Sequence, residues 1–125
     1  MRILLTSLLI ITSAFAHAKT YVFVSFSMPH QLLLETLKES SRLEIPAVLT
    51  GLYHHSMSDT AHELMSLSKE IPNVQLQVDT TLFERFSIGK VPALVVESNS
   101  CFDVIYGNLA LSEALQRIQR QGSCR

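Results

Sequence analysis

Two cysteines, Cys101 and Cys124, are the residues of this chain best suited to covalent chemistry. Cysteine thiols exchange disulfides, bind metals or form a structural bridge, and the redox state of the compartment decides which of these persists. In an oxidising compartment an even number of cysteines indicates a disulfide. The alternative is a redox pair, which is disfavoured because the two residues lie far apart and form no Cys-x-x-Cys motif.

Ser27 is the next candidate, as a nucleophile. A serine nucleophile needs a histidine base and an oxyanion hole. His30 follows on the first turn of the same predicted helix, and this spacing alone does not indicate a partnership. Capping of that helix by Ser27 or Ser25 is the favoured role, because serine hydroxyls accept hydrogen bonds from free N–H groups at helix starts.

Three histidines, His54, His55 and His62, raise the question of a metal site. Helical metal ligands usually stand about four residues apart on one face. Here the adjacent pair lies in a predicted loop, and His62 follows at a different spacing with no cysteine nearby. A solvated loop is therefore favoured, and we expect neither a metal nor a cofactor.

Residues 1–18 have the pattern of a cleavable signal peptide. Arg2 supplies a short positive region, residues 3–15 are mostly apolar, and Ala16-His17-Ala18 places small residues at the expected cut before Lys19. A membrane anchor is the alternative, but an apolar run of about 13 residues is short for a bilayer that needs roughly 20. We expect export to the periplasm and a soluble mature domain, residues 19–125, that does not span the membrane.

The charged residues exclude one class of partner. The net charge is −1, and basic and acidic residues are scattered rather than grouped. A protein that binds nucleic acid through its backbone phosphates usually carries a basic stripe or patch. We therefore expect no nucleic-acid partner, and the length fits a single domain.

Hydrophobic periodicity alternates between strands and helices along the chain. Strands are predicted at residues 20–26, 46–50, 74–78, 93–96 and 102–106. Helices are predicted from Pro29 to about Ser41, from Ser58 to Pro72, over residues 80–86, and from Leu111 to near Gly122. In the second helix the residues expected to face inward are Ala61, Leu64, Met65 and Leu67. This order predicts an α/β fold with a mostly parallel sheet, covered on both faces, and an antiparallel C-terminal hairpin.

Two segments resemble thioredoxin-like proteins. Residues 21–29 (YVFVSFSMP) are similar to the region that carries the redox motif, and residues 86–96 (FSIGKVPALVV) are similar to the segment that runs into the cis-proline strand. With the short helical FERFSI between them, the order and spacing of these motifs most resemble the TrbC family, periplasmic assembly proteins of F-type conjugative pili. The resemblance covers nearly all of residues 20–121.

The resemblance implies a thioredoxin-like three-layer fold, with a central mixed sheet flanked by helices. It also implies a role in plasmid transfer: assembly of the conjugative pilus and its type IV secretion system, together with a TraW-like partner in the periplasm. Some members of the family carry an additional N-terminal region, so functions that depend on such a region are not implied for this chain.

The resemblance also locates a candidate site. Redox relatives carry thiols at the turn that here reads Ser25-Phe-Ser-Met28, and neither a hydroxyl nor a thioether forms a disulfide. It further implies that the Val91–Pro92 bond is cis, and that Pro92 faces this turn, where redox relatives hold an extended peptide by backbone hydrogen bonds. We hypothesise that the same surface docks a partner's strand without catalysis. Its residues are Ser25, Phe26, Ser27, Met28, Val91 and Pro92.

Two other functions remain open at this point. One is a divergent thioredoxin-like disulfide isomerase or periplasmic chaperone, which would show thiol-dependent activity. The other is a generic exported thioredoxin-like module that acts outside conjugation, which neighbouring genes would reveal.

The predicted topology brings the two cysteines together. Cys101 precedes a strand that spans about 20 Å, and the last helix returns antiparallel over about 15 Å before Cys124. We predict a structural disulfide that contributes about 3 kcal/mol to stability. Thiol titration of natively exported, denatured protein should detect no thiol before reduction and two after it. Two thiols before reduction would contradict the bridge.

Overall fold

The computed structural model describes residues 19–99, 101–107 and 110–122. The predicted signal peptide, residues 1–18, lies outside the described residues, and so does Cys124. The predictions of cleavage before Lys19 and of a Cys101–Cys124 disulfide therefore stay predictions. Among the described helices, none has the length and apolar character needed to cross a membrane.

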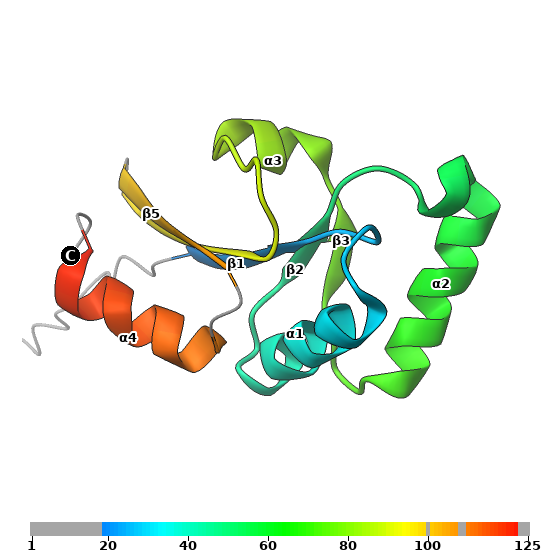
Figure 1. Cartoon of the computed structure of the whole chain (residues 1–125), viewed down its shortest axis with the longest axis horizontal. Coiled ribbons are helices and arrows are strands. Elements are labelled where there is room, and N and C mark those ends of the chain that lie inside the picture. The colour runs from blue at the N-terminus through cyan, green and yellow to red at the C-terminus, as the bar shows by residue number, and fades with distance from the viewer. Residues whose placement is uncertain (1–18, 100, 108–109, 123–125) are drawn as a thin grey trace, which may run out of the picture.

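A five-stranded mixed sheet forms the centre of the fold (Figure 1). In spatial order its strands are β3 (Leu76–Val78), β2 (Ala47–Leu49), β1 (Lys19–Val24), β4 (Ala93–Ser98) and β5 (Cys101–Tyr106). β1 is parallel to β2, and β2 is parallel to β3. β4 is antiparallel to both of its neighbours, β1 and β5. The sheet thus has the parallel part and the antiparallel C-terminal hairpin that the order of elements predicted.

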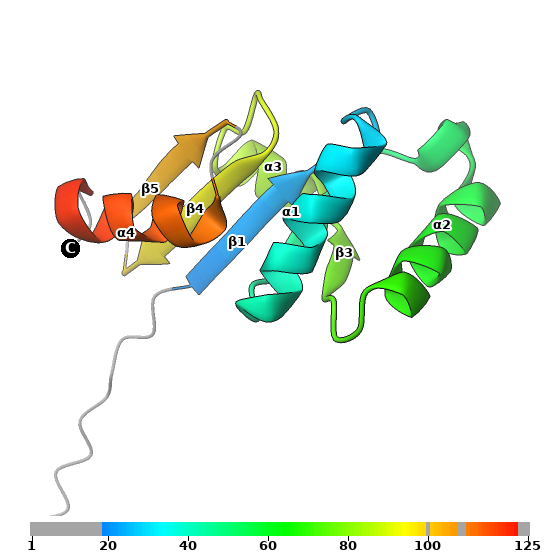
Figure 2. The ribbon, with the colours of Figure 1, turned by 60° about the horizontal axis from the view of Figure 1, so that its bottom comes forward.

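Helices cover both faces of this sheet, as Figures 1 and 2 show. α1 (His30–Arg42) and α4 (Leu111–Gln121) lie on one face, and α3 (Thr80–Arg85) lies on the other. α2 (Met57–Glu70) lies beside α1 at the β3 end, and a single turn of 3-10 helix, η1 (Tyr53–His55), joins β2 to α2. The result is the three-layer α/β arrangement that was expected.

β1 is buried on both faces because helices cover the sheet on either side. Val22 and Val24 point into the core under α1 and α4, whereas Phe23 points into the core under α3. All three side chains are fully buried. β-branched and aromatic residues suit such a strand, since they pack well on a pleated surface. β1 ends at Val24, earlier than the periodicity predicted, because the next residues form a turn.

The helices α1 and α4 follow their predicted patterns. Leu33, Leu34 and Leu37 of α1 are buried against the sheet. In α4 the buried positions are Leu111, Ala114 and Ile118. These spacings place one apolar stripe per helix toward the core, as expected for helices that pack on one face of a sheet.

The predicted inward face of α2 is wrong at two positions. Leu67 is buried and Leu64 is partly buried, but Ala61 is exposed and Met65 is 57% exposed. α2 carries apolar residues on two adjacent faces, and the sequence pattern did not distinguish them. The face that packs inward is instead completed by Thr60 and by Ile71, which follows the helix.

The core under α3 is built from aromatic rings. The Phe23 ring meets the Phe83 ring edge to face, with centroids 4.8 Å apart, and lies 5.9 Å from the Phe86 ring. Edge-to-face rings are stabilised beyond the area that they bury. Because α3 is short, these rings supply much of the apolar cover on this face of the sheet.

We predict that Phe23→Ala lowers the free energy of unfolding by about 3 to 5 kcal/mol, because it leaves a cavity in a fully packed core. Urea denaturation followed by circular dichroism measures the loss. The matched control is Phe102→Ala, whose side chain is 42% exposed and which should cost about 1 kcal/mol. Equal losses in the two variants would contradict this account of the core.

Candidate docking surface

The turn after β1 is closed by its own hydrogen bonds. The Met28 N–H donates to the Ser25 carbonyl (3.2 Å), and the Ser25 N–H donates to the Met28 Sδ atom (3.4 Å). The Ser25 and Ser27 hydroxyls lie 2.8 Å apart, and the Ser27 N–H also donates to Ser25 Oγ (3.1 Å). The turn is therefore a compact unit that displays Phe26 and Ser27 at the surface.

The prediction that Ser25 or Ser27 caps α1 is wrong. Pro29 occupies the N-cap position, and no side chain accepts a hydrogen bond from the start of the helix. The two serines bond to each other within the turn instead. Proline fits at this point because it has no N–H to satisfy and its restricted φ suits a helix start.

The six residues of the predicted surface separate into two groups. Ser25, Phe26 and Val91 are partly exposed and Ser27 is exposed, so these four can contact a partner. Met28 is only 7% exposed and belongs to the core under α1. Pro92 is buried as well. Met28 and Pro92 thus support the exposed residues from the core and offer little area to a partner.

The proline segment lies against the same core as the turn. The Val91–Pro92 bond is cis, as the resemblance implied. Phe26 and Val91 both pack against the buried cluster that contains Met28. Pro92 itself lines a pocket of about 240 Å³ between α1 and the start of α4, together with Leu32 and other residues of those helices.

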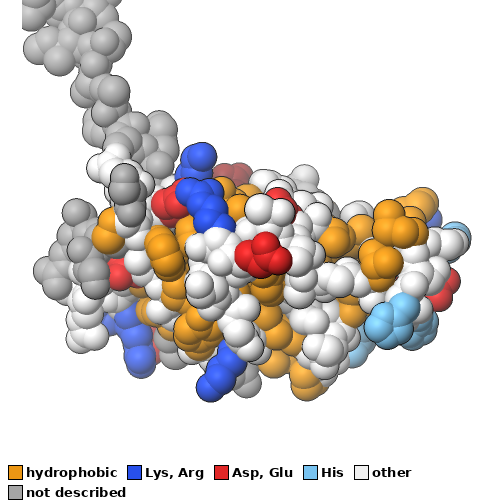
Figure 3. Space-filling view, turned by 90° about the horizontal axis from the view of Figure 1, so that it is seen from above, with side chains coloured by type: hydrophobic (Ala, Val, Ile, Leu, Met, Phe, Trp, Pro, Cys, Tyr) orange, Lys and Arg blue, Asp and Glu red, His pale blue; other side chains and the backbone are white. Residues whose placement is uncertain are grey.

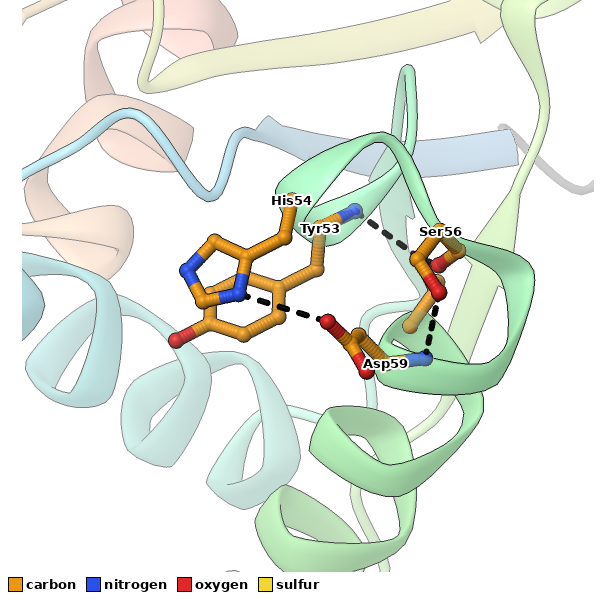
Figure 4. Close-up of polar contacts among 5 residues, drawn as sticks. Tyr53, His54, Ser56 and Asp59 are labelled. Atoms are coloured by element: carbon orange, nitrogen blue, oxygen red, sulfur yellow. Dashed lines mark hydrogen bonds and ion pairs between the residues drawn. The ribbon is translucent and has the colours of Figure 1, made fainter.

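The loop that carries Tyr53 and His54, which we call the aromatic loop, extends this surface. The Tyr53 ring of η1 meets the Phe26 ring edge to face at 5.2 Å, and the His54 ring stacks on Tyr53 at 4.0 Å. His54 Nδ1 lies 3.4 Å from Asp59 Oδ2, and Figure 4 shows the imidazole over the phenol ring with one nitrogen directed at this carboxylate. We call Ser25, Phe26, Ser27, Val91, Tyr53 and His54 the turn–loop surface.

The first turn of α2 holds the aromatic loop in place. The Tyr53 N–H donates to Thr60 Oγ1 (2.8 Å), and the same hydroxyl donates to the Ser56 carbonyl (2.6 Å). Ser56 also caps α2, since its Oγ accepts from the Asp59 N–H (3.2 Å; Figure 4). His54 needs this support because its backbone is left-handed, with φ at 53°.

The histidines do not assemble a metal site in the part of the chain that the structure describes. No group of three or more metal-ligating side chains occurs among those residues. His54 stacks on Tyr53, and its ring nitrogen meets one carboxylate. Figure 3 shows histidine and hydrophobic side chains together at the η1–α2 end of the molecule.

The side chains of this surface are suited to recognition. Ser27 Oγ is hydrogen-bonded to another serine hydroxyl, which is not a general base. The turn presents hydroxyls and an aromatic ring and carries no thiol. Partly exposed aromatic rings beside polar groups are well suited to anchoring a protein partner, because they bury large areas with few rotamers to fix.

Sequence reasoning missed Tyr53 and the structural role of His54. The sequence indicated a polar loop after Gly51, and nothing in it linked this loop to Phe26. The contact joins residues far apart along the chain, so only the packing of α2 beside α1 reveals it. An aromatic residue soon after a buried strand is the only available signal, and it is a weak one.

Comparison with known sequences gives one family and one relative. The family model of the type-F conjugative transfer system pilin assembly protein, TrbC, matches residues 22–118. Over 103 residues the chain is 40% identical to "Periplasmic protein TrbC" of Escherichia coli strain K12, covering 82% of this chain and 49% of that protein. The chain therefore spans about half the length of the curated relative that it matches.

Comparison with solved structures shows a thioredoxin-like fold. The thioredoxin lipoprotein Etrx1 of Streptococcus pneumoniae aligns with a TM-score of 0.59 at 14% identity, over 84% of this chain and 85% of that one. The N-terminal domain of PilB from Neisseria gonorrhoeae aligns with a TM-score of 0.58 at 13% identity, over 86% and 79%. These identities are low, so the likeness concerns the fold alone.

We predict that Thr60→Val loosens the aromatic loop. The valine leaves the partly buried Tyr53 N–H without its acceptor, a loss of about 1 kcal/mol or more. Amide exchange measured by NMR should therefore accelerate about tenfold or more at Tyr53. Thr60→Ser retains the hydroxyl and should leave the Tyr53 amide as protected as in the parent. Unchanged exchange in the valine variant would contradict this role of Thr60.

Proposed function

The chain belongs to the TrbC family of type-F conjugative transfer system pilin assembly proteins, and we propose that it is a periplasmic assembly factor that acts by binding other transfer proteins. In this proposal the turn–loop surface is the contact surface and no reaction is catalysed. The partner is a periplasmic conjugation protein, most directly a TraW-like protein.

The observation that carries the proposal is that the turn after β1 has no thiol and that its polar side chains are hydrogen-bonded within the turn. Its hydroxyls bond to each other, and its methionine sulfur is buried and accepts a backbone hydrogen bond. Thiol–disulfide exchange needs an exposed thiolate and a second thiol, and this turn carries neither group. The fold that presents the turn is retained, which supports a binding role.

The relative supports the proposed location. The E. coli protein is called periplasmic in its name, and residues 1–18 here have the pattern of an export signal. We propose that this segment is removed and that residues 19–125 form the mature domain, closed by a Cys101–Cys124 disulfide. Because the chain spans about half of that relative, the activity of the longer protein is itself part of the proposal.

The turn–loop surface fits an extended partner segment. Phe26 and Tyr53 supply an aromatic wall, and Val91 packs against the same buried cluster as Phe26. A partly exposed backbone next to apolar side chains is a common way to hold a peptide strand. Ser27 then offers an exposed hydroxyl at the rim of the contact.

We predict that Phe26→Ala weakens binding of a TraW-like partner about tenfold, as expected when an aromatic anchor is truncated. Isothermal titration with purified partner measures the change, and pilus assembly and mating in a complemented deletion strain report its consequence. Phe102→Ala is the matched control, because Phe102 lies on β5 and outside the turn–loop surface. Equal binding by the two variants would remove the turn–loop surface from the proposal.

The rival function, a disulfide isomerase, is tested separately. The proposal expects no reduction of insulin and no refolding of scrambled ribonuclease above the uncatalysed rate. Thiol-dependent activity in the parent protein that is lost in a Cys101→Ser, Cys124→Ser double variant would contradict the binding role.

A further inference from the structure

The outer face of α2 is apolar and unpartnered within the described chain. Met57, Ala61 and Met65 are exposed at helical spacing, and Met65 is 57% exposed. This stripe continues into an open groove of about 450 Å³ between α2 and β3 (Figures 1 and 2 show the two elements side by side). The groove is lined by Leu64, Met65, Ser68, Lys69, Val74 and Leu76.

β3 contributes unpaired backbone groups to this groove. It is the terminal strand of the sheet, hydrogen-bonded only to β2. The Ala47 N–H donates to the Gln75 carbonyl, and the Asp79 N–H donates to the Leu49 carbonyl. Alternate residues of a strand point their backbone groups in opposite directions. The N–H and C=O groups of Leu76 and Val78 therefore point away from β2, along the open edge.

The side chains of the same two residues extend the apolar surface. Leu76 packs against the core under α1, and Val78 is 40% exposed. Because side chains alternate across a strand, Leu76 and Val78 lie on the same face of the sheet, the face that α1 and α2 cover. An incoming strand would find hydrogen-bonding groups at the edge and an apolar groove on one face.

One charged side chain lines the groove. Lys69 is the only charged residue among those that line it, and it forms no ion pair with the described residues. A positively charged rim on an apolar groove favours a segment that carries a carboxylate, because the pair gains attraction and excludes basic competitors.

We propose that the groove between α2 and β3 binds an extended segment of a partner protein that adds to β3 as a further strand. The segment has apolar side chains at alternate positions, which enter the groove beside Met65, and a carboxylate that meets Lys69. An extended segment is favoured over a helix because only the former satisfies the edge N–H and C=O groups of Leu76 and Val78. This site is separate from the turn–loop surface.

The test uses two fluorescein-labelled synthetic peptides, each alternating valine with polar residues. The polar residues are glutamate and threonine in one peptide, and lysine and threonine in the other. Fluorescence polarisation with the mature protein should show that the acidic peptide binds at least about fivefold more tightly than the basic one. Lys69→Glu should abolish or reverse this preference. Lys38→Glu, which makes the same charge change on an exposed position of α1, should preserve it.

NMR amide exchange distinguishes strand addition from other occupants. The acidic peptide should slow exchange at Leu76 and Val78 about tenfold or more, because their N–H groups become hydrogen-bonded. Val78→Pro removes one of these donors without removing a β2–β3 bond and should weaken binding, whereas Val78→Ala keeps the donor and should bind more tightly than the proline variant.

Three results would overturn the proposal. The first is the absence of acidic-peptide binding up to about 1 mM in protein that is folded by circular dichroism. The second is binding that leaves the Leu76 and Val78 amides unchanged, which would indicate a helical or side-chain-only contact. The third is sedimentation showing that the protein self-associates through this groove, which would make a second copy its occupant. None of these results bears on the turn–loop surface.

Discussion

The burial of β1 is the constraint on which the rest of the structure depends. β1 pairs with β2 on one side and β4 on the other, and its last three side chains are fully buried between helices on both faces. Both edges and both faces of β1 are occupied, so only one register satisfies its neighbours. A shift by one residue would turn the Phe23 side chain to the other face of the sheet, away from the core under α3. This fixes where β1 ends, and therefore where the following turn emerges.

The turn that emerges there is held by its own side chains and carries no thiol. Met28 anchors the turn by burying its side chain, and its sulfur accepts the Ser25 N–H. The serine hydroxyls satisfy each other, so the turn needs neither a thiol nor a capping bond to the helix. What the scaffold still positions is an aromatic ring, Phe26, at the surface. Positioning without reactive groups is sufficient for recognition.

α2 contributes both to the turn–loop surface and to the groove beside β3. Its first turn binds the Tyr53 backbone through Thr60, which places the Tyr53 ring against Phe26. Further along, its outer face turns Met65 toward the groove at β3. Both arrangements depend on which side of α2 packs inward. The burial of Leu67 and Thr60 settles that orientation, and the exposed methionines follow from it.

The sequence by itself determined the order of elements, the stripes of α1 and α4, and the family, because periodicity and local motifs are properties of neighbouring residues. It also placed the candidate turn and its partner proline segment. Only the tertiary structure decided which of two apolar faces of α2 is buried, that Met28 and Pro92 lie below the surface, and that Tyr53 meets Phe26. These features arise from contacts between residues distant in the chain. Where the local sequence allows two arrangements equally well, only the packing partners decide which one forms.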